Sequence, residues 1–547
     1  MGRPGPDVVE REGLLTRDPE SMADHPGGDE ESAIPAWRRR VRRQLPPWLN
    51  YKIVLLSLAL MGISVGFLAN AFRGVRGGQE APPAPQNPAQ PISEPVAGSP
   101  SDPAWVSFEP GVCKDAGFRW QDAVLPLVFS EDRNVAFVEE LDEQRTTGAP
   151  VRVAGYVQVL QVAEGDDPRI LLEIASNDED IPIDVLTDES SQAMRVRVPS
   201  KFDSSRYREP CVEMRATIFV PRDGDIGGFT VGTVHLDISL IESLSLRVSD
   251  FSKISSVVGD ISSASSYPPP YGERRTASAK STDLTFVPAR DSYNFHSRVI
   301  EVSTTTGKIH GNWPLFDMLG LHTTSGDITA SITPKDALAS DPKPAVLSIS
   351  SVSGGIQAAE PVHGEEPLPR RDYLVDVKSI SGVLRCSLAA GAGTHLKSTS
   401  SDITVDLQPV FNKDKVTRDQ PAQLETITTS GLTTVRILEP LWFEGDQSSS
   451  TKPATASGSG TLDRLEATHK SSSGNIRLRY PQSWEGNLFA ESMSGSMGIK
   501  GKDVRVVRRS TGWPRSMHAR KGDDSKDASL IRVHSLSGDL DAVIGDV

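Results

Sequence analysis

Four aspartates follow the turn of a repeated Ser-Gly-Asp-Ile-like pattern: Asp260, Asp327, Asp402 and Asp539. Glycoside hydrolysis needs two carboxylates roughly 5–10 Å apart. In stacked strands only neighbouring units, about 4.8 Å apart, could supply such a pair, and no two of these aspartates lie in consecutive aligned repeats. One carboxylate per unit also provides too few oxygens for Ca²⁺. We therefore interpret the aspartates as turn-forming residues and predict no catalytic, cofactor or metal site, with a β-helix polysaccharide-active enzyme as the alternative.

The three cysteines are too few for a disulfide-rich miniprotein or a multi-cysteine zinc module. Cys113 and Cys211 bracket the first β-rich stretch and are candidates for a disulfide outside the cytosol. Cys386 stands in the inward-facing column between Leu384 and Leu388 and is interpreted as a small core residue. The chain contains no nucleophile elbow, His-Glu-x-x-His, Cys-x-x-Cys or phosphate-binding Gly-Lys-Ser/Thr motif. These observations predict a protein that is not an enzyme.

Chain length and net charge limit the number of folded units and the kinds of ligand that the protein can have. A chain of 547 residues should hold more than one folded unit. Its net charge of −14 argues against nucleic-acid binding, which needs a dominant basic surface. The basic stretch between Arg505 and Lys521 is therefore interpreted as a solvated insert, with contact to an acidic polysaccharide left open.

One apolar segment predicts a membrane anchor. Residues 53–72 are uncharged over about 30 Å of helix, enough to span a bilayer, so we place a transmembrane helix at 52–73. Residues 1–51 form a disordered tail that ends in a basic cluster, which predicts a cytosolic N-terminus and a single-pass type II topology. An uncleaved signal-anchor is preferred to a cleaved signal peptide, because more than fifty residues precede the apolar run. The C-terminal part is then extracellular or luminal, in the plasma membrane or in ER/Golgi membranes.

The remaining chain is predicted to be all-β. Residues 74–104 are Pro-rich and favour an extended stalk. Residues 105–250 show period-two alternation, which is typical of strands with one buried face and predicts a small β-rich, sandwich-like domain. From 251 to 547 the sequence repeats ten times around a Ser-Gly corner, with polar inserts between some repeats.

Aligned on the glycine position, the repeats carry an aliphatic column two residues later. Its predicted members are Ile261, Ile309, Ile328, Ile356, Leu384, Ile403, Ile476, Met497 and Leu540, with Thr433 as a departure. A second apolar column lies five residues before the glycine. Because these two offsets differ by an odd number, a regular strand could not point both columns to one side. The chain must therefore bend at the glycine, which tolerates backbone angles that other residues resist, and stacking would bury both columns in one interior.

The Ser-Gly-Asp/Asn-Ile core resembles the adhesin-like β-solenoid family of domains of unknown function, related repeats of which occur in fungal single-pass membrane proteins. The resemblance covers residues 251–547 and rests on a degenerate motif. It implies a right-handed parallel β-helix, a surface or scaffold role and no catalytic residues. We therefore expect a non-enzymatic membrane protein that presents an adhesin-like β-solenoid to an extracellular or luminal glycan or protein. An accessory subunit of a secretory-pathway membrane complex is a further alternative.

Overall fold

The computed structural model describes residues 108–545, except 109, 114, 144–146, 205–208, 266–285, 287–292, 363–367, 444–459 and 523–527. The described residues form strands, turns and irregular segments without a helix, so the predicted all-β class is confirmed. Within this part no helix is long and apolar enough to cross a membrane. The predicted tail, transmembrane helix and stalk lie outside the described residues.

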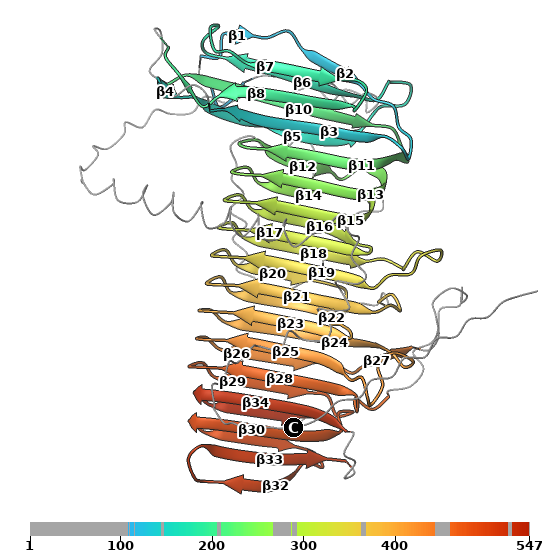
Figure 1. The fold of residues 1–547 in the computed structure, drawn as a ribbon, viewed down its shortest axis with the longest axis vertical. Helices are drawn as coiled ribbons and strands as arrows, with labels where there is room; N and C mark the ends of the chain where they lie inside the picture. The colour runs from blue at the N-terminus through green and yellow to red at the C-terminus, as the bar shows by residue number, and fades with distance from the viewer. Residues whose placement is uncertain are drawn as a thin grey trace, which may run out of the picture. The chain divides into compact units, whose positions relative to one another are not determined.

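The larger sheet has sixteen strands and runs along the long axis of the described part (Figure 1). From β15 to β28 every pairing in it is parallel, and each strand pairs with the one from the next repeat. In spatial order its strands are β32 (Arg505–Ser510), β33 (Arg515–Lys521), β30 (Gly486–Ser494), β34 (Ser529–Ser537), β28 (Leu465–Ser471), β25 (Ala422–Thr428), β23 (Gly393–Ser398), β21 (Tyr373–Ser379), β19 (Ala345–Ser351), β17 (Met318–Thr323), β15 (Asn294–Thr304), β13 (Ser245–Ser256), β11 (Gly224–Thr233), β3 (Asn134–Asp142), β8 (Ala193–Pro199) and β7 (Asp184–Asp188).

A second long series of strands, which we call the opposite sheet, faces the first across the core. Its main ladder contains β31 (Met497–Gly501), β35 (Leu540–Ile544), β29 (Ile476–Tyr480), β26 (Thr433–Ile437), β24 (Ile403–Asn412), β22 (Leu384–Ala390), β20 (Ile356–Ala359), β18 (Ile328–Pro334), β16 (Ile309–Leu315), β14 (Ile261–Ser265), β12 (Asp237–Ile241), β5 (Arg152–Gln161), β10 (Cys211–Val220) and β6 (Arg169–Ser176). The short strands β1 (Phe118–Arg119) and β2 (Ala123–Pro126) pair with β6, and β27 (Leu441–Phe443) pairs with β24. A separate two-stranded pair joins β4 (Ala149–Pro150) to β9 (Lys201–Phe202).

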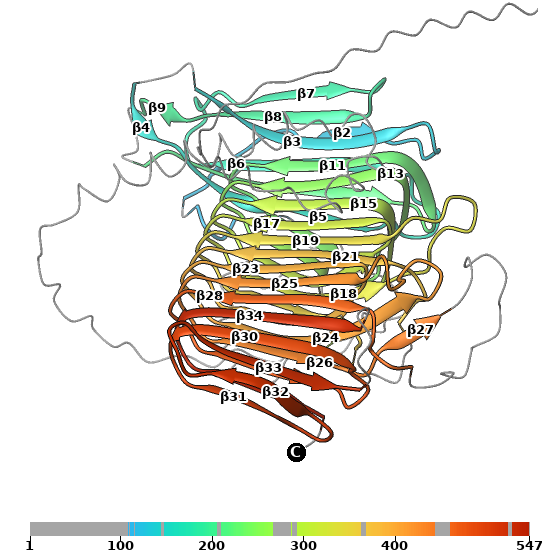
Figure 2. The same cartoon turned by 60° about the horizontal axis from the view of Figure 1, so that its bottom comes forward.

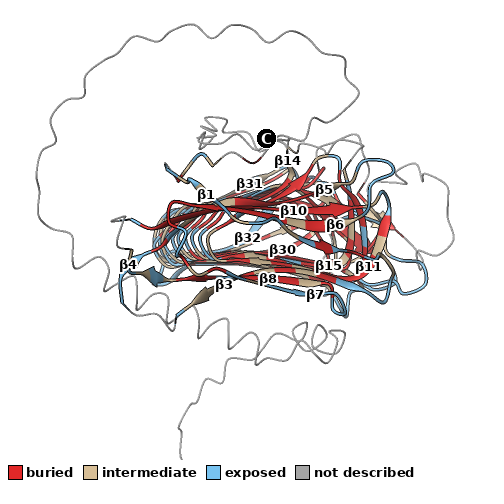
Figure 3. Cartoon of the chain, turned by 90° about the horizontal axis from the view of Figure 1, so that it is seen from above, coloured by how far each residue is buried: buried red, intermediate tan, exposed pale blue. Residues whose placement is uncertain are grey.

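The repeats explain this two-layer arrangement. Each contributes one strand to the sixteen-stranded sheet, turns at the Ser-Gly corner and contributes the next strand to the opposite sheet, as in β17 and β18. We call such a strand–turn–strand unit a rung. Alternate residues of both strands are buried, and the buried side chains of all rungs join one continuous hydrophobic cluster (Figure 3).

The predicted boundary between residues 250 and 251 falls inside β13, which spans Ser245–Ser256. This strand pairs in parallel with β11 on one side and β15 on the other. The described strands before residue 250 therefore share their sheets and hydrophobic core with the repeats that follow. Strands β11 and β12 form a further rung, in which Leu236 occupies the position that glycine takes in the later repeats. Because this rung lacks the glycine, the sequence repeat does not reveal that the stack begins before residue 251.

Spatial order departs from sequence order at the C-terminal end. Strand β34 pairs in parallel with both β28 and β30, so it lies between them (Figure 2). In the opposite sheet β35 likewise pairs with β29 and β31. The last rung of the chain is thus inserted between the two preceding rungs, and the antiparallel strands β33 and β32 continue the sheet beyond β30.

Candidate binding surface

The predicted aliphatic column lies between the two sheets. Its members from Ile261 to Leu540 pair in register from rung to rung, as Ile328, Ile356 and Leu384 do. The structure buries Ile261, Ile309, Ile328, Ile356, Leu384, Ile403, Ile476 and Leu540 almost completely, and Thr433 with them. Met497 is only partly buried because its strand, β31, pairs only with β35 within the described residues.

The column five residues before the glycine is also buried, and it contains two polar residues. Thr426 and His469 occupy adjacent rungs there, with the Thr426 Oγ1 2.7 Å from the His469 Nδ1. The other ring nitrogen, Nε2, lies 2.8 Å from the Tyr480 hydroxyl. Burial lowers the pKa of His469 to about 3, so the imidazole is neutral and is a structural part of the core.

At most positions of the glycine column the structure shows a steric reason for glycine, whereas Gly431 (φ 133°) and Gly538 (φ 156°) adopt the expected unusual backbone angles. Gly354 lies outside the left-handed backbone region, yet a Cβ built on it would stand 1.8 Å from the carbonyl oxygen of Gly326. Glycine is therefore required at this position by the close approach of the neighbouring rung's backbone. Where Ser401 replaces glycine, its hydroxyl donates a hydrogen bond to the Gly382 carbonyl.

Gly354→Ala should accordingly destabilise the protein by about 1–3 kcal/mol, since backbone must shift to admit the methyl group. The matched control is Gly355→Ala, whose added Cβ would find its nearest neighbour 3.6 Å away. Urea unfolding midpoints of the two purified variants would check this. Equal midpoints would contradict the steric explanation.

A buried Ser/Thr column, missed in the sequence, lies at the corners, and in six repeats its hydroxyl accepts the backbone N–H three residues later. The residue three before the glycine position is Ser or Thr in all ten repeats: Ser256, Thr304, Thr323, Ser351, Ser379, Ser398, Thr428, Ser471, Ser492 and Ser535. The Ser379 hydroxyl accepts the Gly382 N–H at 2.9 Å, and Thr323 does the same for Gly326. In these six repeats the hydroxyl satisfies a buried donor that the sharp corner leaves without a strand partner. The Ser351 and Ser492 hydroxyls have no hydrogen-bond partner among the described residues.

Removing one of these hydroxyls leaves that donor unpaired. Ser379→Ala is expected to cost about 1–3 kcal/mol, the penalty of a buried unsatisfied N–H. Ser400→Ala, at an exposed site on the next turn, is the control and should change stability little. Thermal unfolding of both variants measures the difference. A hydroxyl with only a surface role would give the same small change at both sites.

The turn aspartates link neighbouring rungs. The Asp402 Oδ1 accepts the Leu432 N–H at 2.8 Å, and Asp327 makes the equivalent bond to Gly355. Asp260 is likewise bonded to the Lys308 N–H, and Asp539 to the Ser496 N–H. This geometry gives each carboxylate a structural role. Among the described residues, no group of three or more His, Cys, Asp or Glu side chains is arranged to hold a metal ion.

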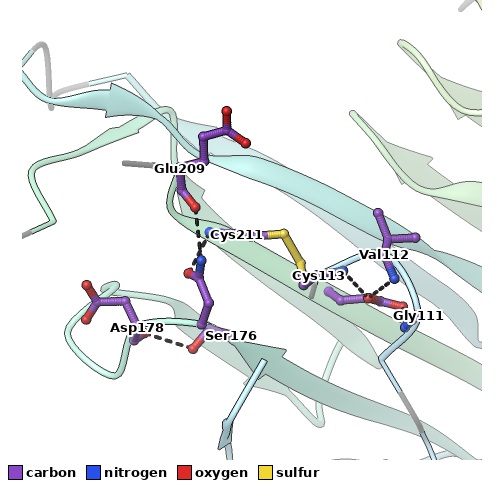
Figure 4. Close-up of a disulfide and its surroundings, with 9 residues drawn as sticks. Gly111, Val112, Cys113, Ser176, Asp178, Glu209 and Cys211 are labelled. Carbon is purple, nitrogen blue, oxygen red and sulfur yellow. Dashed lines mark hydrogen bonds between the residues drawn. A yellow bond between two sulfur atoms is a disulfide. The ribbon is translucent and has the colours of Figure 1, made fainter. Parts of the chain in front are cut away.

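Cys113 and Cys211 form a disulfide near the N-terminal end of the described part (Figure 4). Beside it, the Glu213 carboxylate accepts the backbone N–H groups of residues 111, 112 and 113 at 2.8–2.9 Å. The Asn177 Oδ1 accepts the Cys211 N–H. The bond therefore ties the segment before β1 to the start of β10. Cys386 is free and buried in the core.

The carboxyl group of Glu360 is buried, and only one of its two oxygens has a hydrogen-bond partner among the described residues. Glu360 accepts the Ala389 N–H through Oε2, while its Oε1 has no hydrogen-bond partner among the described residues. Burial raises the pKa of Glu360 to about 8, with the hydrogen bond from Ala389 opposing the shift. The group is therefore mostly protonated at neutral pH, which reduces the cost of burying it.

This shift predicts how stability depends on pH. Between the ordinary pKa near 4.5 and the folded value near 8, the unfolded state binds fewer protons than the folded state. The contribution of Glu360 to the free energy of unfolding should therefore fall as pH rises through this window and level off above it. Glu360→Gln should flatten the profile and raise stability at pH 9. Urea titrations from pH 5 to 9, with the exposed-site variant Glu301→Gln as control, provide the measurement, and an unchanged slope would refute the prediction.

The outward face of the sixteen-stranded sheet is the best candidate for binding. Because its strands pair in register, equivalent outward side chains line up in rows along the stack. A half-exposed apolar row runs across β15 to β21 as Val299, Met318, Val346 and Leu374. A polar row beside it includes His395, whose Nδ1 lies 3.2 Å from the Glu425 carboxylate. The face repeats equivalent positions from rung to rung, which suits an extended ligand.

No protein-family model matches the sequence. A search of curated proteins likewise finds no match. One solved structure, a crystal structure of a putative cell adhesion protein from Clostridium sporogenes, aligns over 78% of this chain and 99% of its own. The two share 5% sequence identity, with a TM-score of 0.14.

Proposed function

We propose that this chain is a non-enzymatic, single-pass membrane protein that presents an adhesin-like β-solenoid outside the cytosol for adhesion, binding or scaffolding. The observation that carries the proposal is the in-register stacking of rungs, which repeats the same outward positions at a fixed interval on the sixteen-stranded sheet. Repeat proteins use such extended surfaces for recognition. The proposed ligand is an extracellular or luminal glycan or protein.

Binding can be tested with the full-length protein in detergent on glycan and protein arrays. A ligand of the outward face should lose binding when His395 and Glu425 are both replaced by alanine. Arg385→Ala and Arg436→Ala, on exposed positions of the opposite sheet, serve as the control pair. No ligand on either array, or equal loss with both pairs, would count against this surface. Turnover of a polysaccharide would instead favour the enzyme alternative.

Two features support placement outside the cytosol. The basic cluster before residues 52–73 predicts a cytosolic N-terminus, and a structural disulfide such as Cys113–Cys211 is typical of oxidising compartments. Protease protection of an N-terminal and a C-terminal tag in sealed vesicles tests this topology. Cytosolic exposure of the C-terminal tag would reject it, and retention in internal membranes would favour the accessory-subunit alternative.

A further inference from the structure

The two ends of the sixteen-stranded sheet are open edges. Within the described residues β7 pairs only with β8, and β32 pairs only with β33. The two edges lie at opposite ends of the long axis (Figure 1, Figure 2). An edge strand presents unpaired N–H and C=O groups to which another strand can bind.

The β7 edge is acidic. Residues 178–189 contain six Asp and Glu residues, five of them exposed and Asp178 buried, and no Lys or Arg. The nearest cations in the sheet, Arg195 and Arg197, lie one strand inward on β8. Its outward face carries Asp184, Leu186 and Asp188, all exposed, with Leu186 53% exposed. A nearby hollow of about 390 Å³ is lined by Glu140, Leu141, Asp142, Glu143 and Arg197.

The β32 edge is basic. Residues 500–521 contain eight Lys and Arg residues, of which Lys521 is buried, and one Asp, in a chain whose net charge is −14. Five of the six residues of β32 are exposed: Arg505, Val506, Val507, Arg508 and Arg509. Trp513, in the turn after β32, is 76% exposed. A hollow of about 240 Å³ at this end includes Arg509 and Arg515 in its lining.

We propose that copies of this chain associate head to tail, with the β7 edge of one copy against the β32 edge of the next. Opposite charge on the two edges favours this contact, while like charge opposes β7–β7 and β32–β32 pairing. Exposed apolar side chains on both edges, such as Leu186 and Val507, become buried by the same contact. Because the contacting surfaces differ, the association is heterologous and continues into linear arrays. This inference goes beyond the proposed function, since it requires no glycan or protein ligand.

Sedimentation velocity of the full-length protein in detergent tests the proposal. At about 0.05 M salt the wild type should form concentration-dependent oligomers, and at about 0.5 M salt these should dissociate, because salt screens exposed charges. Charge reversal of the basic edge (Arg505→Glu with Arg508→Glu) should weaken association at least about tenfold. Reversal of the acidic edge (Asp184→Lys with Glu189→Lys) should do the same; Asp188 is retained because it caps the local turn.

Mixing the two variants gives the decisive result. Each variant alone has two ends of like charge, whereas the mixture again offers complementary ends, so association should return. Recovery on mixing also shows that both variants are folded. A monomeric wild type at low salt, or undiminished association of either variant, would overturn the proposal. Association that disappears only with the basic edge, and is driven by added anionic polysaccharide, would overturn it in favour of a glycan site.

Discussion

Ile356→Ala is expected to lower the free energy of unfolding by about 2–5 kcal/mol. The side chain is fully buried and lies in register between Ile328 and Leu384, so its removal leaves a cavity in the middle of the stack. Each rung contacts only its neighbours, so a weakened central rung should also make unfolding less cooperative. Urea unfolding followed by far-ultraviolet circular dichroism would show a lower midpoint and a broader transition.

Ile380→Ala provides the matched control. Ile380 lies on the turn of the following rung and is 50% exposed, so the same substitution there should change stability by a few tenths of a kcal/mol. Equal effects at the two sites would mean that the aliphatic column is not the interior of the stack.

Loss of the Cys113–Cys211 disulfide is the second large effect expected. The cysteines are 98 residues apart, and closing so long a loop restricts the unfolded chain strongly. Cys113→Ser with Cys211→Ser should therefore cost about 2–5 kcal/mol. The loss should be concentrated at β1, β6 and β10, where the bond and the Glu213 carboxylate hold the chain. Hydrogen exchange of native protein, read by mass spectrometry, would locate it.

Treatment with a reductant distinguishes the effect of losing the disulfide from the effect of the two serine substitutions themselves. Dithiothreitol should destabilise the wild type by a similar amount and leave the double variant unchanged. If dithiothreitol leaves the stability of the wild type unchanged and both cysteines are found as free thiols, the disulfide does not form in the native protein.

Some of the architecture could be predicted from the repeats, since burial imposes its own spacing on the sequence. The offset between the two apolar columns required a bend at the glycine, and the structure has a corner there. The Ser/Thr column three residues before the glycine, such as Ser379, carried an equally regular signal. Alternation of apolar residues does not reveal this column, because its side chains are polar and the Ser379 hydroxyl is buried through its hydrogen bond to the Gly382 N–H.

Other features leave little or no trace in one sequence. The insertion of β34 between β28 and β30 is invisible to alignment, because equivalent rungs can stack in any order with the same local pattern. The rung formed by β11 and β12 does not show the Ser-Gly motif, because Leu236 occupies its glycine position. Glu360 gave no signal, since nothing in the sequence shows that its carboxyl group is buried.

The central claim is that successive repeats stack as parallel strands in register, and paired cysteines measure this directly. Ser350 lies opposite Lys378 on the outward face of β19 and β21, and in-register neighbours are within disulfide reach. Under mild oxidation Ser350→Cys with Lys378→Cys should form a disulfide in most molecules. Ser350→Cys with Asp376→Cys, offset by two residues, should remain largely reduced. Cross-linking of the offset pair as readily as the in-register pair would contradict the stacking.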